Sequence, residues 1–367
     1  MTAPLETYCT LLTDGTHYTP VNAGTGFPFL TVADMQPEGL NFSSCSRITS
    51  EDFDAADRQN SAPKAGDVLF SKDGTVGKVH VVDGEAPFAV LSSIAIIRPD
   101  RERLDPNYLA HFLRTPEAIS AADRSKTGSA LRRIILKDIK RLLIDPPDLY
   151  EQQRIAAILD QADALRRLRR QSLSRLSALG QSIFYEMFGD PKVGLADAEE
   201  LSFGQACEDR TSKFDKIQKS EYQRAGIIPI IDQGQNTIAG WVDDADRVCH
   251  PDTGVVVFGD HTRAIKFVDF PFVIGADGAK VLTPSKRFDP LFFSELLRLL
   301  PIPELGYSRH MREVKKMMLP CPSLERQTDF SDRLSTSKAT RNKYEAALAM
   351  ADNLFASLQQ RAFRGEL

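Results

Sequence analysis

One long helical pattern occurs twice in this chain, in the same register. The first copy begins at Pro147 and ends at Gly189 to Pro191. Its apolar residues follow a four-three alternation, which is typical of a helix that packs against one partner helix. They are Ile155, Leu159, Ala162, Leu173, Leu176, Ile183 and Met187. Adding 175 to each number gives a second stripe, from Phe330 to Ala362. Since neither stripe can be buried alone, we expect the two helices to pair.

The segments that precede the two helices also share one plan. Both contain short β-branched and aromatic runs separated by turn residues, followed by short helices. Segments 227–231 and 255–260 of the second half correspond to segments 27–32 and 68–72 of the first half. The offset between matching residues varies inside these segments and settles at 175 along the helices. The chain is therefore a tandem duplication of a globular segment and a helix.

This duplication predicts an α+β fold. Two mixed α/β domains are separated by two long helices, which we expect to pair antiparallel as a coiled coil with a pseudo-two-fold internal repeat. The expected segments are 1–146 for the first domain, 147–191 for the first helix, 192–321 for the second domain and 322–367 for the second helix. Such a repeat gives one chain the symmetry that many DNA-binding proteins obtain by dimerising. The heptads alone are equally compatible with two roles for the helices, a spacer between two DNA-binding domains and a dimerisation stalk.

Composition narrows the class of protein. A length of 367 residues, with 42% hydrophobic and 26% charged residues, fits a globular protein of two domains. The N-terminus lacks a secretion signal, and no apolar run is long enough to cross a membrane. Five scattered cysteines without metal-ligand spacing suggest reduced thiols and a cytoplasmic location. The net charge of −4 argues mildly against a stand-alone nucleic-acid binder, so a local basic face or another subunit would have to meet an anionic partner.

Two short motifs are better explained by structure than by catalysis. Segment 145–148 reads Asp-Pro-Pro-Asp, but an amino-methyltransferase motif needs an aromatic fourth residue to stack on the target base. A proline break before the helix explains it better. Segment 72–78 lacks the first glycine and the hydroxyl residue of a phosphate loop. We interpret it as a tight hairpin, whose Lys72 and Lys78 could meet DNA phosphates.

Basic residues gather at corresponding places in both halves. In the second half, His261, Thr262, Arg263 and Lys266 can donate to bases or phosphates, although a structural polar turn is the alternative. A further cluster follows a glycine in each half, and a solvated charged patch is its alternative. The cluster comprises Arg309 and His310 in the second half and Lys126, Arg132 and Arg133 in the first.

The first helix carries arginines on its apolar stripe. Arg166 and Arg169 fall on the stripe itself, within a run that also contains Arg167 and Arg170. We expect the two arginines of the stripe to need Asp, Glu or water partners in the coiled coil.

Longer segments resemble one known family. Segments 151–160 and 181–191 strongly resemble the central conserved region of the specificity subunit of type I restriction-modification systems, and segment 354–367 looks like its C-terminal conserved region. Segments 259–263, 275–278 and 306–310 are similar to one recurring type of its target-recognition domain. The resemblance covers essentially the whole chain, in the order domain, helix, domain, helix.

This resemblance implies a subunit without an active site or cofactor of its own. Two modification subunits would bind S-adenosylmethionine and methylate adenine, and restriction subunits, which use Mg and ATP, would cleave unmodified DNA. Each domain would read one half of a bipartite double-stranded target, while the helices set the spacing and dock the modification subunits. The expected partner-binding residues are Gln152, Phe184, Phe188, Phe355 and Phe363.

Other functions were weighed against this one. A specificity module of a related fused or type II-like restriction-modification system would share the same features. A fused methyltransferase-nuclease would need a cofactor-binding domain, and we find no pattern for one. A coiled-coil interaction protein without a DNA role would explain the helices but not the duplicated basic clusters.

Overall fold

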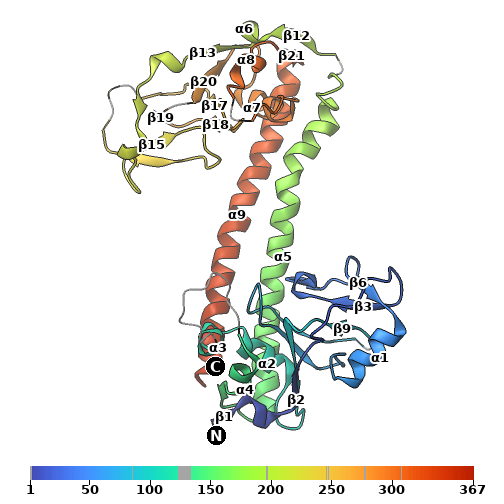
Figure 1. The fold of residues 1–367 in the computed structure, drawn as a ribbon. Coiled ribbons are helices and arrows are strands. Elements are labelled where there is room, and N and C mark those ends of the chain that lie inside the picture. The colour runs from blue at the N-terminus through green and yellow to red at the C-terminus, as the bar shows by residue number, and fades with distance from the viewer. Residues whose placement is uncertain are drawn as a thin grey trace. The chain divides into compact units, whose positions relative to one another are not determined.

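The longest elements of the computed structural model are two 40-residue helices, α5 (Leu149–Phe188) and α9 (Leu324–Phe363). At 1.5 Å per residue each is about 60 Å long. The structure describes residues 2–84, 86–122, 134–195, 197–244, 246, 248–276, 278–306 and 308–367. The chain forms two compact units: unit 1 contains 1–171 and 346–367, and unit 2 contains 172–345 (Figure 1). Each long helix therefore contributes a part to each unit.

The two long helices pack against each other in antiparallel directions. In unit 1, Arg166 on α5 meets Asp352 on α9, and the earlier Arg154 donates to the carbonyl of the later Leu367. In unit 2, the rings of Phe184 and Phe330 meet edge to face, with centroids 5.5 Å apart. The predicted α+β fold with two long paired helices is confirmed.

Unit 1 is built on two main sheets. An antiparallel sheet has the order β2-β10-β7-β8, and a three-stranded sheet has the order β6-β3-β9, in which β3 and β9 run parallel. The bounds are β2 (Cys9–Asp14), β10 (Ile94–Pro99), β7 (Val68–Ser71), β8 (Val79–Val81), β6 (Ser46–Ile48), β3 (Phe27–Leu30) and β9 (Ala89–Val90). Smaller elements are β1 (Ala3–Pro4), η1 (Leu5–Tyr8), η2 (Val32–Asp34), β4 (Met35–Gln36), β5 (Gly39–Leu40), α1 (Ser50–Arg58), α2 (Pro106–Leu113), α3 (Pro116–Ala122), α4 (Leu136–Lys140) and β11 (Leu143–Ile144).

Unit 2 repeats this topology. Its antiparallel sheet has the order β13-β20-β17-β18, and its second sheet, β14-β19-β15-β16, again holds a parallel pair, β15 with β19. The bounds are β13 (Cys207–Asp209), β20 (Ala279–Pro284), β17 (Val255–Gly259), β18 (Ile265–Val268), β14 (Lys216–Ile217), β19 (Val273–Gly275), β15 (Ile228–Ile231) and β16 (Gly240–Val242). Smaller elements are β12 (Glu199–Ser202), α6 (Phe203–Ala206), η3 (Thr211–Lys213), η4 (Lys219–Glu221), α7 (Pro290–Leu299), α8 (Met311–Val314) and β21 (Met318–Cys321).

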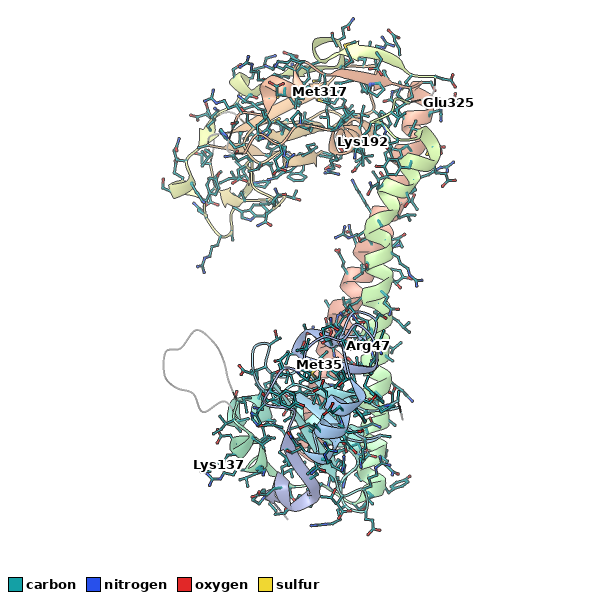
Figure 2. The ribbon with its side chains drawn as sticks, turned by 45° about the vertical axis from the view of Figure 1, so that its right-hand side comes forward. Met35, Arg47, Lys137, Lys192, Met317 and Glu325 are labelled. Atoms are coloured by element: carbon teal, nitrogen blue, oxygen red, sulfur yellow. The ribbon has the colours of Figure 1, made fainter. Side chains whose placement is uncertain are left out.

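Each unit buries an apolar core between its antiparallel sheet, one short helix and the long helices. In unit 1, α2 buries Tyr108, Leu109 and Leu113. In unit 2, α7 buries Phe292 against Phe184 of α5, with stacked rings 5.6 Å apart. Full burial of such a side chain contributes about 1.5 to 3 kcal/mol. The long helices are thus part of both cores. Figure 2 shows the side chains of both units, with Met35 labelled in unit 1 and Met317 in unit 2.

A buried glutamine joins each long helix to the short helix of its unit. Gln152 on α5 accepts a hydrogen bond from the Asp105 N–H and donates to the carbonyls of Arg103 and Pro147. Gln327 on α9 makes the same three bonds, to Asp289, Arg287 and Pro322. Both glutamines are fully buried. Asp105 and Asp289 in turn cap the N-termini of α2 and α7. Each half of the duplicated chain therefore keeps one such hydrogen-bonded joint between its long helix and its short helix.

We expect Gln152→Ala and Gln327→Ala each to lower the free energy of unfolding by about 2 kcal/mol, because buried backbone groups lose their partners. Gln153→Ala is the matched control, since Gln153 is adjacent and exposed. Chemical denaturation checks this. Equal stability of the Gln152 and Gln153 variants would contradict the role of the joint.

Candidate nucleic-acid interface

In unit 2, three loops meet at Asp260, the residue after β17. The Asp260 N–H donates to the Gly278 carbonyl at 2.7 Å, and the Asp260 carbonyl accepts from the His310 N–H at 2.8 Å. The Asp260 side chain accepts from the Met311 N–H at 2.7 Å. The structure thus brings together the three segments that the sequence matched to one type of recognition domain.

Gln233 ties a fourth loop to this junction. Its side-chain oxygen accepts from the His261 N–H at 3.3 Å, and its carbonyl accepts from the Thr262 hydroxyl. A Cβ at Gly278 would lie 2.3 Å from that side-chain oxygen, so a larger residue there would displace the Gln233 amide. Sequence analysis missed Gln233. The available signal was a polar run, 232–237, that directly follows the apolar strand β15.

The predicted DNA-binding residues of this loop cluster differ in exposure. Thr262 and Arg309 are exposed, and His261 is half-buried. Arg263 adopts a left-handed backbone conformation, with φ of 58°, and its guanidinium contacts the Ile302 carbonyl and the Glu304 carboxylate, the latter at 3.1 Å. Arg309 is thus the exposed cation of the group.

His310 has an internal role. It is buried, and its Nδ1 lies 2.8 Å from the Asp260 carbonyl. Its Nε2 accepts from the Leu305 N–H at 3.2 Å. With both ring nitrogens used inside unit 2, His310 holds the loop that carries Arg309.

Two predicted phosphate-binding lysines instead join the two sheets of their units. Lys266 on β18 donates to the Asp232 carbonyl at 2.7 Å, and Lys78, just before β8, donates to the Val32 carbonyl at 2.9 Å. Burial lowers the pKa of Lys266, and Asp232 partly restores it. The two lysines lie two positions apart in the repeat, since Ala264 is the counterpart of Lys78, yet each tethers a strand of the antiparallel sheet to the segment after β3 or β15.

Lys72 occupies in unit 1 the place of Asp260 in unit 2. Its carbonyl accepts from the Ile134 N–H at 2.7 Å, and its ammonium lies 3.4 Å from Asp14. The side chain is 4% exposed, so its charge is compensated inside unit 1. The predicted hairpin is present, since β7 and β8 pair antiparallel around it. Lys126, Arg132 and Arg133 lie outside the described residues.

The predicted partner-binding residues pack within the chain. Gln152 forms the joint described above, and the buried rings of Phe184 and Phe188 belong to the core of unit 2. In unit 1, Phe355 lies under the Arg166 guanidinium, and Phe363 packs on Tyr108, with ring centroids 5.2 Å apart. Contacts of these five residues with another subunit stay a prediction.

Arg166, which lies on the apolar stripe, has the acidic partners that the sequence required. Its guanidinium donates to Asp352 on α9 at 2.6 Å and to Asp163 on α5 at 3.0 Å. Close by, Arg114 at the end of α2 donates to the Val79 carbonyl at 2.7 Å. A polar network therefore joins α5, α9, α2 and β8 in unit 1.

Possible metal ligands, long helices and cysteines in the described part of the chain bear on other kinds of site. No cluster of three or more His, Cys, Asp or Glu side chains there is arranged to hold a metal ion. None of the helices within the described ranges is both long and apolar enough to span a membrane. The five cysteines are free thiols, and burial raises the pKa of Cys207 to about 12. At neutral pH this thiol stays protonated.

Comparison with known proteins shows what this chain is similar to. Residues 15–178 match the family model of the type I restriction modification DNA specificity domain. A putative type I restriction enzyme specificity subunit of Haemophilus influenzae is 33% identical over 118 residues, 32% of this chain and 29% of that protein. The specificity subunit of the Escherichia coli type I restriction enzyme EcoBI is 23% identical over 167 residues, 44% of this chain and 35% of that protein. The matches thus span about a third of each relative.

A solved structure agrees in fold. The type I restriction-modification S subunit from M. genitalium superposes with a TM-score of 0.63 at 15% identity, covering 99% of this chain and 96% of that one. Residues 15–178 are thus similar to that DNA specificity domain, and the whole chain shares its fold with the S subunit from M. genitalium.

The network around Arg114 predicts a pH dependence. Burial, with Arg114 and Lys78 adding to it, lowers the pKa of His80 to about 4, against about 6.5 in an unfolded chain. Between these values the unfolded chain binds the extra proton. The free energy of unfolding should therefore fall as pH falls from 6.5 to 4, by up to about 3 kcal/mol. Urea titrations of wild type and His80→Gln check this.

The matched control is His17→Gln, because His17 is a largely exposed histidine of the same unit. The His80 variant should lose part of the pH dependence, and the His17 variant should keep it. Identical pH profiles for wild type and His80→Gln would contradict the assignment.

Proposed function

We propose that this chain is the DNA-reading subunit of a type I restriction-modification complex, and that each unit reads one half of a bipartite target. The observation that carries the proposal is the duplicated junction after β7 and β17. Lys72 and Asp260 occupy this junction, and each anchors a separate loop through its backbone carbonyl, at Ile134 and His310. Two copies of one reading platform with different side chains suit a target with two different halves.

The proposal assigns base reading to exposed polar groups of the unit 2 loops. Arg309 and Thr262 are exposed on loops that Asp260 and Gln233 hold in place. An arginine can make a bidentate contact with guanine in the major groove, or it can pair with a phosphate. Lys266 supports the Gln233 loop through its bond to the adjacent Asp232 carbonyl.

The proposal also gives the paired helices two tasks, to set the gap between the half-sites and to dock modification subunits. Large apolar side chains are exposed on both helices within unit 1, and such residues suit a protein interface. They are Leu165, Leu168, Met350 and Leu354. S-adenosylmethionine would bind to the modification subunits, and Mg and ATP to restriction subunits.

A gel-shift experiment tests the proposal. The chain is mixed with its modification subunit and with DNA fragments that do or do not carry the methylated motif of the host. The proposal predicts a sequence-dependent shift that requires this chain. A shift that does not depend on sequence, or that forms without the chain, would refute it.

Arg309→Ala should weaken binding to cognate DNA by about 1 to 3 kcal/mol and relax specificity in one half-site, if its guanidinium contacts a base. Lys286→Ala is the matched control, because Lys286 is exposed near the opposite end of β20 from the loop junction. Competition binding with single-base variants of the target measures both effects. An equal loss on every sequence would instead identify Arg309 as a phosphate contact.

A further inference from the structure

A groove of about 490 Å³ in unit 1 has a large excess of positive charge. It is lined by the end of the β7–β8 hairpin, by β4 and by facing parts of α5 and α9. Two carboxylates face it, those of Asp163 and Asp352. Five cations face it as well, which leaves a formal excess of three positive charges in a chain whose net charge is negative. They are Lys78, Arg114, Arg166, Arg167 and Arg170.

The two carboxylates do not satisfy all of the arginines. Arg166 bonds to both of them, and Arg170 shares the same Asp352 oxygen at 2.9 Å. Arg167 approaches Asp163 at 3.6 Å. The side chains of Arg167 and Arg170 are 43% and 47% exposed. Each guanidinium has five N–H donors in a planar fork, so both keep donors directed to the groove and solvent.

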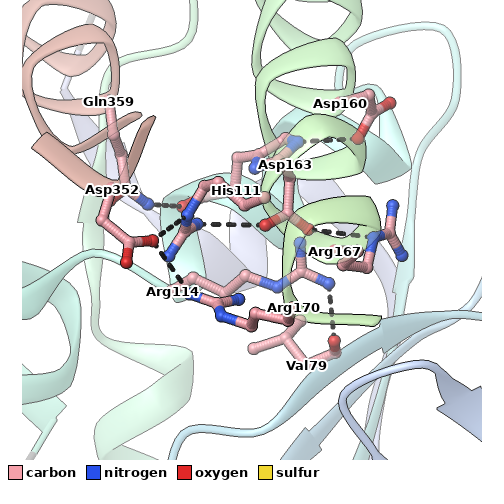
Figure 3. Close-up of polar contacts among 10 residues, drawn as sticks. Val79, His111, Arg114, Asp160, Asp163, Arg167, Arg170, Asp352 and Gln359 are labelled. Carbon is pink, nitrogen blue, oxygen red and sulfur yellow. Dashed lines mark hydrogen bonds and ion pairs between the residues drawn. The ribbon is translucent and has the colours of Figure 1, made fainter. Parts of the chain in front are cut away.

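Arg114 adds a half-buried charge to the wall of the groove. Its guanidinium donates to the Val79 carbonyl (Figure 3). Burial lowers its pKa, yet an arginine remains protonated at any physiological pH. A partly buried cation is less screened by solvent than an exposed one, so it raises the positive potential of the groove.

The internal repeat shows that helix pairing does not need these cations. The residues 175 positions after Arg166, Arg167 and Arg170 are Arg341, Asn342 and Glu345. There the single arginine pairs with the glutamate of its own helix, at 2.8 Å. The second copy forms the same kind of helix pair with one cation where the first has three. Pairing of the helices therefore does not require the extra arginines of α5.

We propose that this groove binds phosphate oxygens of the nucleic-acid backbone, independently of base sequence, through Arg167 and Arg170. A guanidinium fork matches phosphate geometry and binds it in a bidentate manner. Gly77 and Lys78 of the β7–β8 hairpin line the same groove, so it is continuous with the hairpin that carries the unit 1 junction. A strand read at that junction would thus have a phosphate clamp beside it. The inference rests on the DNA-binding function proposed above.

The test compares wild type with the double variant Arg167→Ala/Arg170→Ala in the complex with the modification subunit. DNA affinity is measured from about 50 to 200 mM salt, because each lost phosphate contact lowers the slope of log K against log salt by about 0.9. The double variant should lose about one to two units of slope and the same factor of affinity on cognate and non-cognate DNA. Arg167→Lys/Arg170→Lys should keep most of the slope.

The control is Arg175→Ala, an exposed arginine of α5 outside the groove, which should behave as wild type. Thermal melting of each variant verifies its fold. An unchanged salt slope in a folded double-alanine variant would overturn the inference, and so would a relaxed target motif, which would indicate a base contact. Absence of DNA binding by the wild-type complex would remove the proposed function and this inference with it.

A second measurement distinguishes backbone phosphate from a free anion. Calorimetric titration of the wild-type chain with inorganic phosphate, at constant ionic strength, should give no saturable heat below about 1 mM if the groove needs the polyanionic backbone. Saturable binding in that range that is lost in the double-alanine variant would assign the groove to a free phosphate and overturn the backbone assignment.

Discussion

The fold depends on the burial of two narrow apolar stripes, one on α5 and one on α9. A helix in a protein gains most of its stability from the packing of its apolar face, and here each helix buries its stripe against the other and against the sheets. The apolar contact gives the pairing its free energy, while polar joints fix where along the helix each unit begins. Gln152 and Gln327 are those joints, since each bonds to the capping residue of a short helix. One buried glutamine amide therefore fixes where the short helix of each unit attaches to a long helix.

The duplication has kept scaffold contacts and changed the residue at the loop junction. At the end of α2, Arg114 donates to the carbonyl of Val79, and at the end of α7, Arg298 donates to that of Ile265 at 2.9 Å. Each unit also has a lysine tether between its sheets, although Lys78 and Lys266 are not at corresponding positions. The residue at the loop junction differs: it is a buried lysine in unit 1 and a buried aspartate in unit 2. Two units with a common frame and different loops suit the proposed reading of two different half-sites.

The sequence predicted the architecture better than the side-chain roles. Heptad spacing and a constant offset of 175 are local signals, and they sufficed for the paired helices and for the acidic partners of Arg166. Whether a lysine is buried depends on segments that are distant in the sequence. Lys72 and Lys266 were therefore predicted to face DNA, although they are buried inside unit 1 and unit 2, respectively. Gln233 was missed for the same reason, because its contacts to the 259–264 loop arise only on folding. Arg309 lies after a glycine in an exposed loop, and its contact with DNA stays a prediction.

The central claim is that one chain supplies two half-site readers to a methyltransferase that it does not contain. Methylome sequencing tests this most directly, in cells that carry the modification subunit with and without this chain. The account predicts methylated adenines in a motif of two specified halves separated by a fixed unread gap, and their complete loss when the chain is removed. A motif that persists without the chain, or one uninterrupted motif, would contradict it.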